Sequence, residues 1–298
     1  MISSLSHLPS SGNWTDLAWN GTVFCVVAYN SNKAATSPDG VTWTERTLST
    51  TSNWKSIAWN GSVFCVVSDN SNIVLISADG ITWDQYALPD YSPYGIAAKD
   101  ELFCASPMNT PVMLSTDGIT WTTHAKPNST CHDIISNGSV FCSIGVNSAV
   151  SNESGTSWTQ GTMPVGTNWS RVAWNGDIFC ALSRFNVWNT CAISSDGLVW
   201  SASSTLPTSA TWQGISWNGE VFCAIASGGT ITATSTDGVT WTSYTMPASG
   251  DWHNIIWNGK IFCAVTSSSD LVATSLDGTW QDYEYPFWTN FKGQIEIV

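Results

Sequence analysis

Charged residues are scarce in this chain, and basic residues are the scarcest of them. Charged side chains make up 10% of the 298 residues, against about a quarter in an average globular domain. The chain holds 9 lysines and arginines against 22 acidic residues, which gives a formal net charge of -13. A surface of this sign repels phosphate groups and no basic stripe interrupts it, so we expect neither nucleic acid nor an anionic membrane as a partner.

Long apolar runs are also missing. No segment reaches the roughly 18 consecutive apolar residues that a membrane-spanning helix needs. The segment 1–12 lacks the basic start and apolar stretch of a secretory signal peptide. We therefore expect a soluble chain without a signal peptide, folded in the cytoplasm of the cell that makes it.

Cysteine is present, but its spacing argues against a disulfide framework. Seven of the nine cysteines follow a phenylalanine and recur every 38 to 43 residues, at Cys25, Cys65, Cys104, Cys142, Cys180, Cys223 and Cys263. A period near 40 residues is typical of a propeller or a solenoid. Stacked sheets lie about 10 Å apart, beyond the Cα separation of about 7 Å that a disulfide bridges, so we expect buried free thiols. Cys131 and Cys191 lie at unlike places in neighbouring units; a contact between them stays open, but we expect no bridge.

The rest of the unit repeats with the cysteines. Each copy approximates Trp-x-x-Ile-Ala-Trp-Asn-Gly, then Phe-Cys, then Ser-x-Asp-Gly-x-x-Trp. Six Asn-Gly pairs predict hairpins whose two central residues both have positive φ. Asp-Gly marks a second hairpin in six units, and Ser154-Gly155 replaces it in the fourth. Each unit is therefore expected to hold four short antiparallel strands.

The second strand of each unit is apolar throughout, as in residues 23–27 and 178–182. Such a strand needs a neighbour on both faces of its sheet. Sheets stacked face to face around an axis provide this, whereas helical repeats do not fit the paired hairpins. We predict an all-β, seven-bladed β-propeller with four antiparallel strands per blade at residues 13–286. Residues 1–12 form an N-terminal strand or arm, and residues 287–298 a C-terminal tail for ring closure or docking.

The turn sequence at residues 77–83, Ser-Ala-Asp-Gly-Ile-Thr-Trp, resembles the Asp-box, the repeat of bacterial neuraminidases, but is one residue shorter between Asp and Gly. The whole unit is similar to repeats of tailed-phage virion proteins, especially tail and fibre components, and of bacterial exported proteins. The resemblance covers residues 13–286. It implies structural turns at the repeated aspartates, and a virion protein, folded in the host cytoplasm, whose partners are other virion proteins.

The residues that could carry chemistry do not form a recognisable catalytic set. A sialidase needs three converging arginines, and the three in this chain are Arg46 in the first unit and Arg171 and Arg184 in the fifth. A glycosidase needs two carboxyl groups about 5 to 9 Å apart, but most acids lie in repeated turns. The histidines show no metal-ligand spacing. We therefore expect no catalytic residue, no metal and no cofactor.

Arg171 and Asp133, at equivalent places in adjacent units, are expected to form a salt bridge.

Recognition is expected at the face where the inner strands begin, because the loops between second and third strands also lie there and differ between units. Tryptophan begins the inner strand in five units, and we include Trp169 and Trp212 as candidates for stacking on a sugar, with packing between blades as the alternative. Arg184, Phe185 and Trp188 belong to the longest of these loops and have no counterpart elsewhere, so repeat packing does not explain them.

The repeat stops after Pro286, and the end of the tail alternates like a strand that can pair with another sheet. Its candidate docking residues are Phe287, Trp288, Phe291, Ile295 and Ile297.

The sequence favours a non-enzymatic virion protein, a tail, fibre or decoration component, that presents a propeller face to a host-surface glycan or a virion partner. A glycosidase-like enzyme and a free bacterial lectin are the alternatives.

Overall fold

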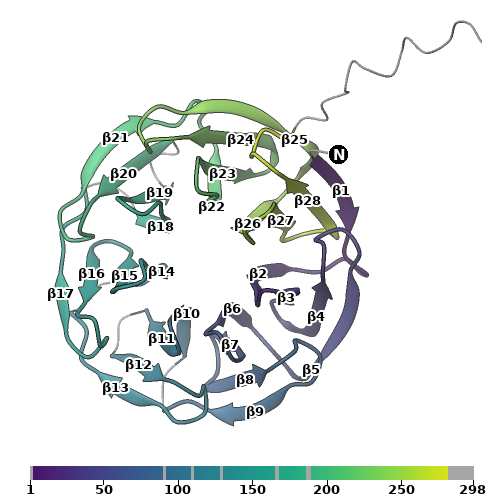
Figure 1. The fold of residues 1–298 in the computed structure, drawn as a ribbon, viewed down its shortest axis with the longest axis vertical. Coiled ribbons are helices and arrows are strands. Elements are labelled where there is room, and N and C mark those ends of the chain that lie inside the picture. Colours follow the sequence, from purple (N-terminus) through teal and green to yellow (C-terminus); the bar gives the residue numbers. More distant parts are fainter. Residues whose placement is uncertain are drawn as a thin grey trace, which may run out of the picture.

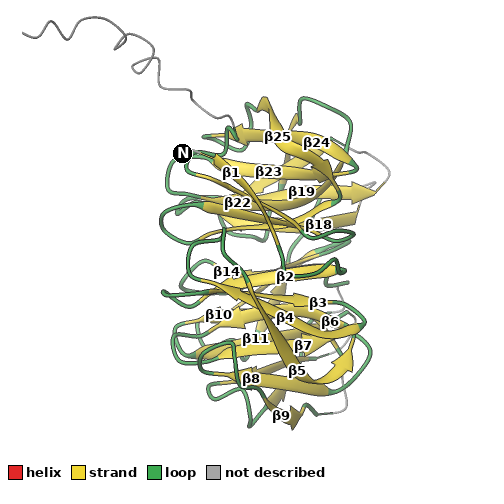
Figure 2. Ribbon diagram, turned by 90° about the vertical axis from the view of Figure 1, so that its right-hand side faces the viewer, coloured by secondary structure: helices red, strands yellow, loops and turns green. Residues whose placement is uncertain are grey.

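The computed structural model describes residues 3–89, 92–108, 111–127, 130–164, 168–185 and 189–280, without the side chains of residues 184, 185, 204 and 205. Within these ranges, 28 strands form seven antiparallel sheets of four strands, arranged as blades around a central axis (Figure 1). Figure 2 shows the disc from its edge. The predicted seven-bladed β-propeller is confirmed. No helix in the described ranges is long and apolar enough to cross a bilayer.

Each blade runs outward from the axis in chain order. The inner strands are β2 (Trp14–Trp19), β6 (Trp54–Trp59), β10 (Pro93–Lys99), β14 (Asp133–Ser136), β18 (Asn168–Trp174), β22 (Thr211–Trp217) and β26 (Trp252–Trp257). The second strands are β3 (Phe24–Ala28), β7 (Phe64–Ser68), β11 (Leu102–Pro107), β15 (Phe141–Ile144), β19 (Phe179–Phe185), β23 (Phe222–Ser227) and β27 (Phe262–Thr266). The third strands are β4 (Ser31–Ser37), β8 (Ile73–Ser77), β12 (Val112–Ser115), β16 (Ser148–Ser151), β20 (Thr190–Ser194), β24 (Gly229–Ser235) and β28 (Leu271–Ser275).

The outermost strands show how the ring closes. Six blades end in β5 (Thr44–Ser52), β9 (Asp84–Ala87), β13 (Thr122–His124), β17 (Trp158–Gln160), β21 (Ser201–Thr205) and β25 (Thr242–Gly250), and the seventh ends in β1 (Ser3–His7). β1 pairs antiparallel with β28, from Ser3 opposite Ser275 to His7 opposite Leu271. The N-terminal strand therefore completes the last sheet and joins the start of the chain to its final repeat. The predicted docking tail, residues 287–298, lies outside the described residues.

The Asn-Gly turns differ from the predicted geometry. Gly21 has a φ of 96°, but Asn20 and the five equivalent asparagines, all described, are not in the positive-φ region. The side chain of Asn20 holds the turn instead, because its Oδ1 accepts hydrogen bonds from the backbone amides of Thr22 and Val23 at 2.9 and 2.8 Å. The prediction of two positive φ angles was wrong: the connection between β2 and β3 is four residues long and is stabilised by a side chain.

The Asp-Gly turns have the structural role expected of them. Oδ1 of Asp79 accepts hydrogen bonds from the backbone amides of Ile81 and Thr82 at 2.8 and 3.1 Å. These two amides lower the pKa of Asp79. Gly80 has a φ of 75°, and a Cβ there would lie 3.0 Å from Thr36 in the preceding blade. The repeated aspartate and glycine thus fix the turn and its approach to the neighbouring sheet.

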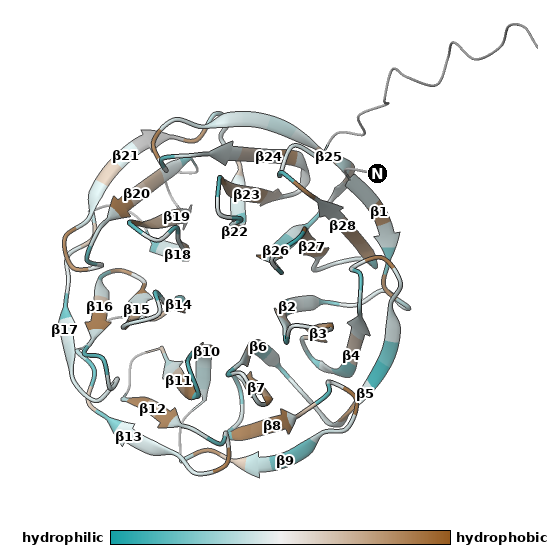
Figure 3. Ribbon diagram, viewed as in Figure 1, coloured by the Kyte–Doolittle hydropathy of each residue, from teal (hydrophilic) through white to brown (hydrophobic). Residues whose placement is uncertain are grey.

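The core lies between the blades. Each Phe-Cys pair is buried between neighbouring sheets, and all nine cysteines are buried free thiols, as predicted. Figure 3 shows apolar residues on strands such as β8, β16 and β20, whereas β5 and β9 at the rim are polar. The stability of the ring therefore comes from apolar surfaces stacked between sheets.

Candidate functional site

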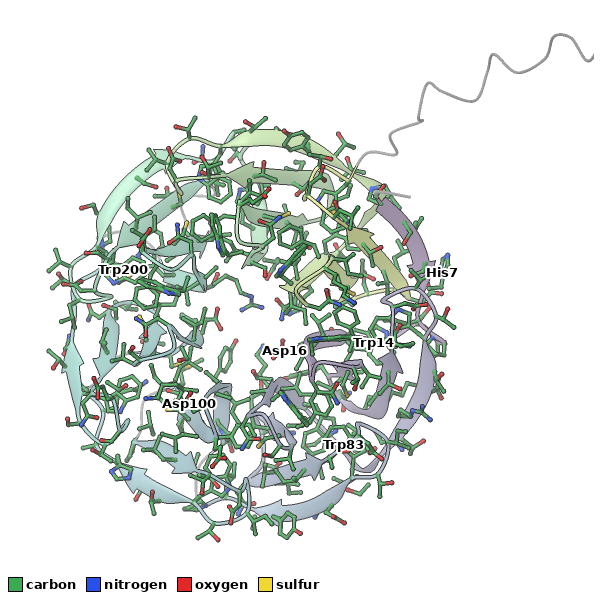
Figure 4. The ribbon with its side chains drawn as sticks, in the orientation of Figure 1. His7, Trp14, Asp16, Trp83, Asp100 and Trp200 are labelled. Atoms are coloured by element: carbon green, nitrogen blue, oxygen red, sulfur yellow. The ribbon has the colours of Figure 1, made fainter. Side chains whose placement is uncertain are left out.

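A cavity of about 340 Å³ occupies the central channel, and residues of all seven inner strands or of the segments just before them line it. In Figure 4, Asp16 lies next to the axis, Trp14 lies deeper in the same blade and His7 lies at the rim. The inner strands begin beside the loops between second and third strands, as when the amide of Tyr29 donates to the carbonyl of Asn13 at 2.7 Å. The cavity lining therefore begins within a few residues of the loop-bearing face on which recognition was predicted.

A β-bulge near the start of the inner strand positions the polar side chains of the cavity. In six blades the register between first and second strands shifts by one residue, for example between Trp14 and Asp16. The extra residues are Thr15, Lys55, Tyr94, Ser170, Gln213 and His253. A bulge redirects side chains that a regular strand would alternate between its two faces. Lys55, Tyr94 and His253 reach the cavity in this way.

The residue that follows the bulge, and its equivalent in the fourth blade, is here named the ring position. Its occupants are Asp16, Ser56, Gly95, Asp133, Arg171, Gly214 and Asn254. Oδ2 of Asp16 accepts hydrogen bonds from the second blade, from Oγ of Ser56 at 2.8 Å and the amide of Ile57 at 2.9 Å. Its Oδ1 accepts from the amide of Leu17 at 2.8 Å and from Nδ2 of Asn254 in the seventh blade at 2.5 Å. Asp16 therefore connects three blades.

Asp133 makes a similar connection between the fourth and fifth blades. Its Oδ1 accepts the amide hydrogen of Ile134 and its Oδ2 that of Val172, both at 3.0 Å. Burial raises the pKa of Asp133 to about 6, although the positive charge of Arg171 opposes the rise. Burial also raises the pKa of Asp16. Both carboxylates are thus held by backbone amides in a poorly solvated site.

The predicted salt bridge between Asp133 and Arg171 does not form. Among the described residues, no oxygen of Asp133 lies within 4 Å of a guanidinium nitrogen. The carboxylate is turned toward the amides of Ile134 and Val172, and Nη1 of Arg171 donates to the carbonyl of Ser170 at 2.9 Å. Nε of Arg171 is buried and has no hydrogen-bond partner. The guanidinium therefore lies beside the cavity with donors that the protein does not use.

Aliphatic side chains make up most of the remaining lining, and cations and aromatic rings are set among them. Lys55 and Arg171 are two of the nine basic residues of a chain whose net charge is -13, and both line the cavity. Nζ of Lys55 lies 4.5 Å from the ring centroid of Tyr94, and the ring of Tyr94 meets that of His132 edge to face at 6.0 Å. A lysine over an aromatic face is held by a cation–π interaction. The cavity is thus more basic than the molecule around it.

The opposite end of the cavity is aromatic. Trp174 and Trp217, at the ends of β18 and β22, line it, and each is half-buried against the phenylalanine of the next strand, with ring centroids 4.4 and 4.7 Å apart. In the described residues, no group of three or more His, Cys, Asp or Glu side chains is placed to hold a metal ion. The arrangement offers hydrogen-bond donors at one end and aromatic surface at the other, which suits a small polar ligand.

The structure corrects part of the predicted binding site. Trp169 and Trp212 are fully buried and belong to the apolar core between blades. A side chain without exposed surface cannot stack on a ligand, so neither belongs to the site. The side chains of Arg184, Phe185 and Trp188 lie outside the described residues. The same holds for all the predicted docking residues, Phe287, Trp288, Phe291, Ile295 and Ile297.

One feature of the sequence marks the cavity residues, although the predicted site did not include them. Within the inner strand, the flanking tryptophan and isoleucine repeat from unit to unit, whereas the two residues between them do not. The cavity residues at these variable places include Lys55, Tyr94, His132, Arg171 and His253. Positions that vary within an otherwise repeated unit are where a repeat protein can build a binding site.

Comparison with known proteins shows the fold. Residues 37–168, less than half of the chain, match the DUF6242 β-propeller domain. No curated protein matches the sequence. The chain is a β-propeller. Virginiamycin B lyase from Staphylococcus aureus is similar in structure, with a TM-score of 0.79 and 14% identity over 91% of this chain and 98% of the lyase.

Two further solved structures share the fold. YCF48 bound to D1 peptide has a TM-score of 0.74 and 14% identity over 93% of this chain and 95% of that chain. The β-propeller domain of Myceliophteria thermophila Cps50 (Swd1) has a TM-score of 0.71 and 10% identity over 92% of this chain and 99% of that chain. At such low identity these similarities establish architecture alone. The resemblance to neuraminidase and virion repeats stays a prediction.

Proposed function

We propose that this protein is a non-enzymatic recognition propeller that takes part of its ligand into the cavity of the central channel. The observation that carries the proposal is the convergence of unrepeated polar and aromatic side chains on one cavity. Bulges in the second, third and seventh blades turn Lys55, Tyr94 and His253 into it, and Arg171 lines the same cavity. A rigid ring that presents such groups can fix the orientation of a ligand at little entropic cost.

The hydrogen bonds of the two cavity carboxylates support binding rather than catalysis. A paired-carboxylate hydrolase needs one group to donate a proton and another to attack or activate water. Asp16 receives four hydrogen bonds from three blades, and Asp133 receives two from backbone amides. These contacts commit both groups to joining blades. The cations and aromatic rings of the lining, Lys55, Arg171 and Tyr94 among them, remain to meet a ligand.

The proposed setting of this recognition is a virion, in a tail, fibre or decoration component folded in the host cytoplasm. Its support is the resemblance of the repeat to virion proteins, together with a net charge of -13 that disfavours nucleic acid. The ligand is then a host-surface glycan or a neighbouring virion protein. Mass spectrometry of purified particles tests the setting: absence of the protein from particles that carry their other tail proteins would contradict it.

A glycan array combined with product analysis tests the function. We expect the purified protein to bind a subset of glycans without releasing a shortened product. Tyr94→Ala removes an aromatic wall of the cavity and should abolish binding. Asp177→Asn, in an exposed hairpin turn, is the matched control and should leave binding unchanged. A released sugar would favour the glycosidase alternative, and binding that survives Tyr94→Ala would place the ligand elsewhere.

A further inference from the structure

Arg171 breaks the pattern of the ring position. At three ring positions, Asp16, Ser56 and Asp133, a side-chain oxygen accepts an amide hydrogen of the next blade, as Asp133 does from Val172 at 3.0 Å. Arginine has donors only, so Arg171 cannot connect its blade to the next in this way. The position is glycine in the third and sixth blades, at Gly95 and Gly214, and the ring closes there too. Packing therefore does not require this guanidinium.

The donors of Arg171 are largely unused. Nη1 donates to the carbonyl of Ser170 at 2.9 Å, while the buried Nε has no partner. The positive charge of Arg171 acts to lower the pKa of Asp16 and of Asp133 through space. Within the described part of the chain, however, no carboxylate oxygen of either residue lies within 4 Å of a guanidinium nitrogen of Arg171. A buried donor without a partner is unfavourable, and a bound acceptor removes that cost. The geometry therefore leaves a place beside Arg171 for an acceptor inside the cavity.

The charges around Arg171 select a single negative charge. A carboxylate matches the planar guanidinium and can accept two parallel hydrogen bonds from it. A phosphate dianion carries more charge and is repelled more strongly by Asp16 and Asp133 nearby. Lys55, which lines the same cavity, adds a second cation. Lys55 and Arg171 together offset the charges of Asp16 and Asp133, so the lining is close to neutral and admits a singly charged carboxylate more readily than a dianion.

The rest of the lining favours a sugar as the carrier of that carboxylate. Tyr94, Trp174 and Trp217 present aromatic surface, on which the apolar face of a sugar ring can pack, and Ser216 offers a hydroxyl. A peptide would more often add to a strand edge or occupy a groove, whereas this cavity of about 340 Å³ is enclosed by a ring of inner strands. Building on the recognition function above, we propose that the cavity binds an acidic sugar of the uronic-acid class and that Arg171 pairs with its carboxylate.

Isothermal titration with galacturonate and its methyl ester tests this proposal. The two probes share every hydroxyl group, and only galacturonate carries the single negative charge. We expect galacturonate to bind at least about ten-fold more tightly than the ester, the effect of losing one charge-assisted contact. Arg171→Gln should weaken binding by a similar factor. Arg171→Lys keeps the charge without the planar fork and should fall between them.

Arg46→Gln is the matched control. It removes an arginine from β5 at the rim, where its Nε donates to Oγ1 of Thr36 at 3.0 Å, and should bind galacturonate like the natural protein. Tryptophan fluorescence melts establish that each variant is folded; where Arg171→Gln does not fold, Arg171→Lys and the ester comparison decide. Undetectable binding of galacturonate overturns the proposal. Equal binding of the ester, or equal binding by folded Arg171→Gln, also overturns it.

Two further probes separate the chemistry of the ligand from the recognition function itself. Preferential binding of inorganic phosphate, or of a peptide ending in aspartate, overturns the sugar assignment. A neutral glycan whose binding is lost in Tyr94→Ala would overturn this inference and leave the proposed function intact. Binding that no cavity variant changes would contradict the proposed function instead.

Discussion

Asp133 should make the propeller more stable at mildly acidic pH than at neutral pH. Burial raises its pKa to about 6 in the folded protein, with Arg171 opposing the rise and Asp16 adding to it. In an unfolded chain the pKa of an aspartate is about 3.9. The folded state therefore binds the proton more tightly. The resulting stability is fully present below about pH 4 and is lost as the pH rises through about 6.

The two pKa values set the magnitude. Their difference of about 2 corresponds to about 3 kcal/mol in the free energy of unfolding between the fully protonated and fully ionised limits. Between pH 4.5 and 7.5 the expected loss is about 2 kcal/mol. The turn aspartates act in the opposite direction at lower pH, because backbone amides lower the pKa of Asp79 and Asp117. The stability that these aspartates contribute to the folded protein is present above about pH 4 and is lost as the pH falls.

A difference measurement isolates Asp133. Asp133→Asn removes the titration and keeps an acceptor oxygen at the same place. Urea unfolding of both proteins, followed by the fluorescence of the 19 tryptophans, should give a stability difference, natural protein minus variant, that falls by about 2 kcal/mol from pH 4.5 to 7.5. The control Asp177→Asn, in an exposed turn, should show a difference that stays within about 0.5 kcal/mol over the same range.

A constant difference for Asp133→Asn would refute this reasoning. It would mean that the folded carboxyl titrates at its ordinary pKa, so that the amides and Arg171 fully offset its burial. A difference that grows with pH would reverse the sign, because it would show that the folded protein prefers the ionised form.

Other parts of the ring lend themselves to equally direct measurements. Asp16→Ala leaves two backbone amides without an acceptor and should lower the free energy of unfolding by about 1 to 3 kcal/mol for each, read from urea titration; an unchanged midpoint would show that water replaces the carboxylate. Deleting residues 1–8 removes β1 from β28 and should lower the melting temperature by at least about 5 °C; an unaltered melt would contradict the closure role of β1. Gly197→Ala, at a φ of 71°, places a Cβ 2.8 Å from the preceding blade, whereas Gly176→Ala, at a φ of 106°, meets no atom within 4 Å. Gly197→Ala should therefore destabilise by about 1 to 3 kcal/mol more in denaturant titration, and equal losses would exclude the contact as the cause. All nine thiols are buried, so Ellman's reagent should label none in the native protein and nine in urea, and rapid native labelling would contradict the burial.

The fold could be predicted from the sequence because local signals specify it. A Phe-Cys pair every 38 to 43 residues predicts the blades, and the dipeptides at their turns predict the hairpins. The turn geometry at Asn20 was missed because its side chain, not its backbone, satisfies the turn. The free thiols followed from the spacing of stacked sheets.

The site could not be predicted in the same way, because it depends on register. The bulge between Trp14 and Asp16 carries no glycine or proline that would mark it. It decides which residues turn toward the axis, and side chains about 40 residues apart then converge. The same geometry explains the error at Trp169 and Trp212: the tryptophan just before the bulge is buried between blades, whereas residues after it reach the cavity.

The ring position links the stability of the propeller to the chemistry of its cavity. Asp16 and Asp133 join blades through amides that favour their ionised form, while burial opposes ionisation. Arg171 stabilises both negative charges through space. Had it formed an ion pair with Asp133, that contact would have consumed its donors. Because the carboxylates take their hydrogen bonds from the backbone, one guanidinium can balance their charge and still bind a ligand, which a ring of seven identical units could not arrange.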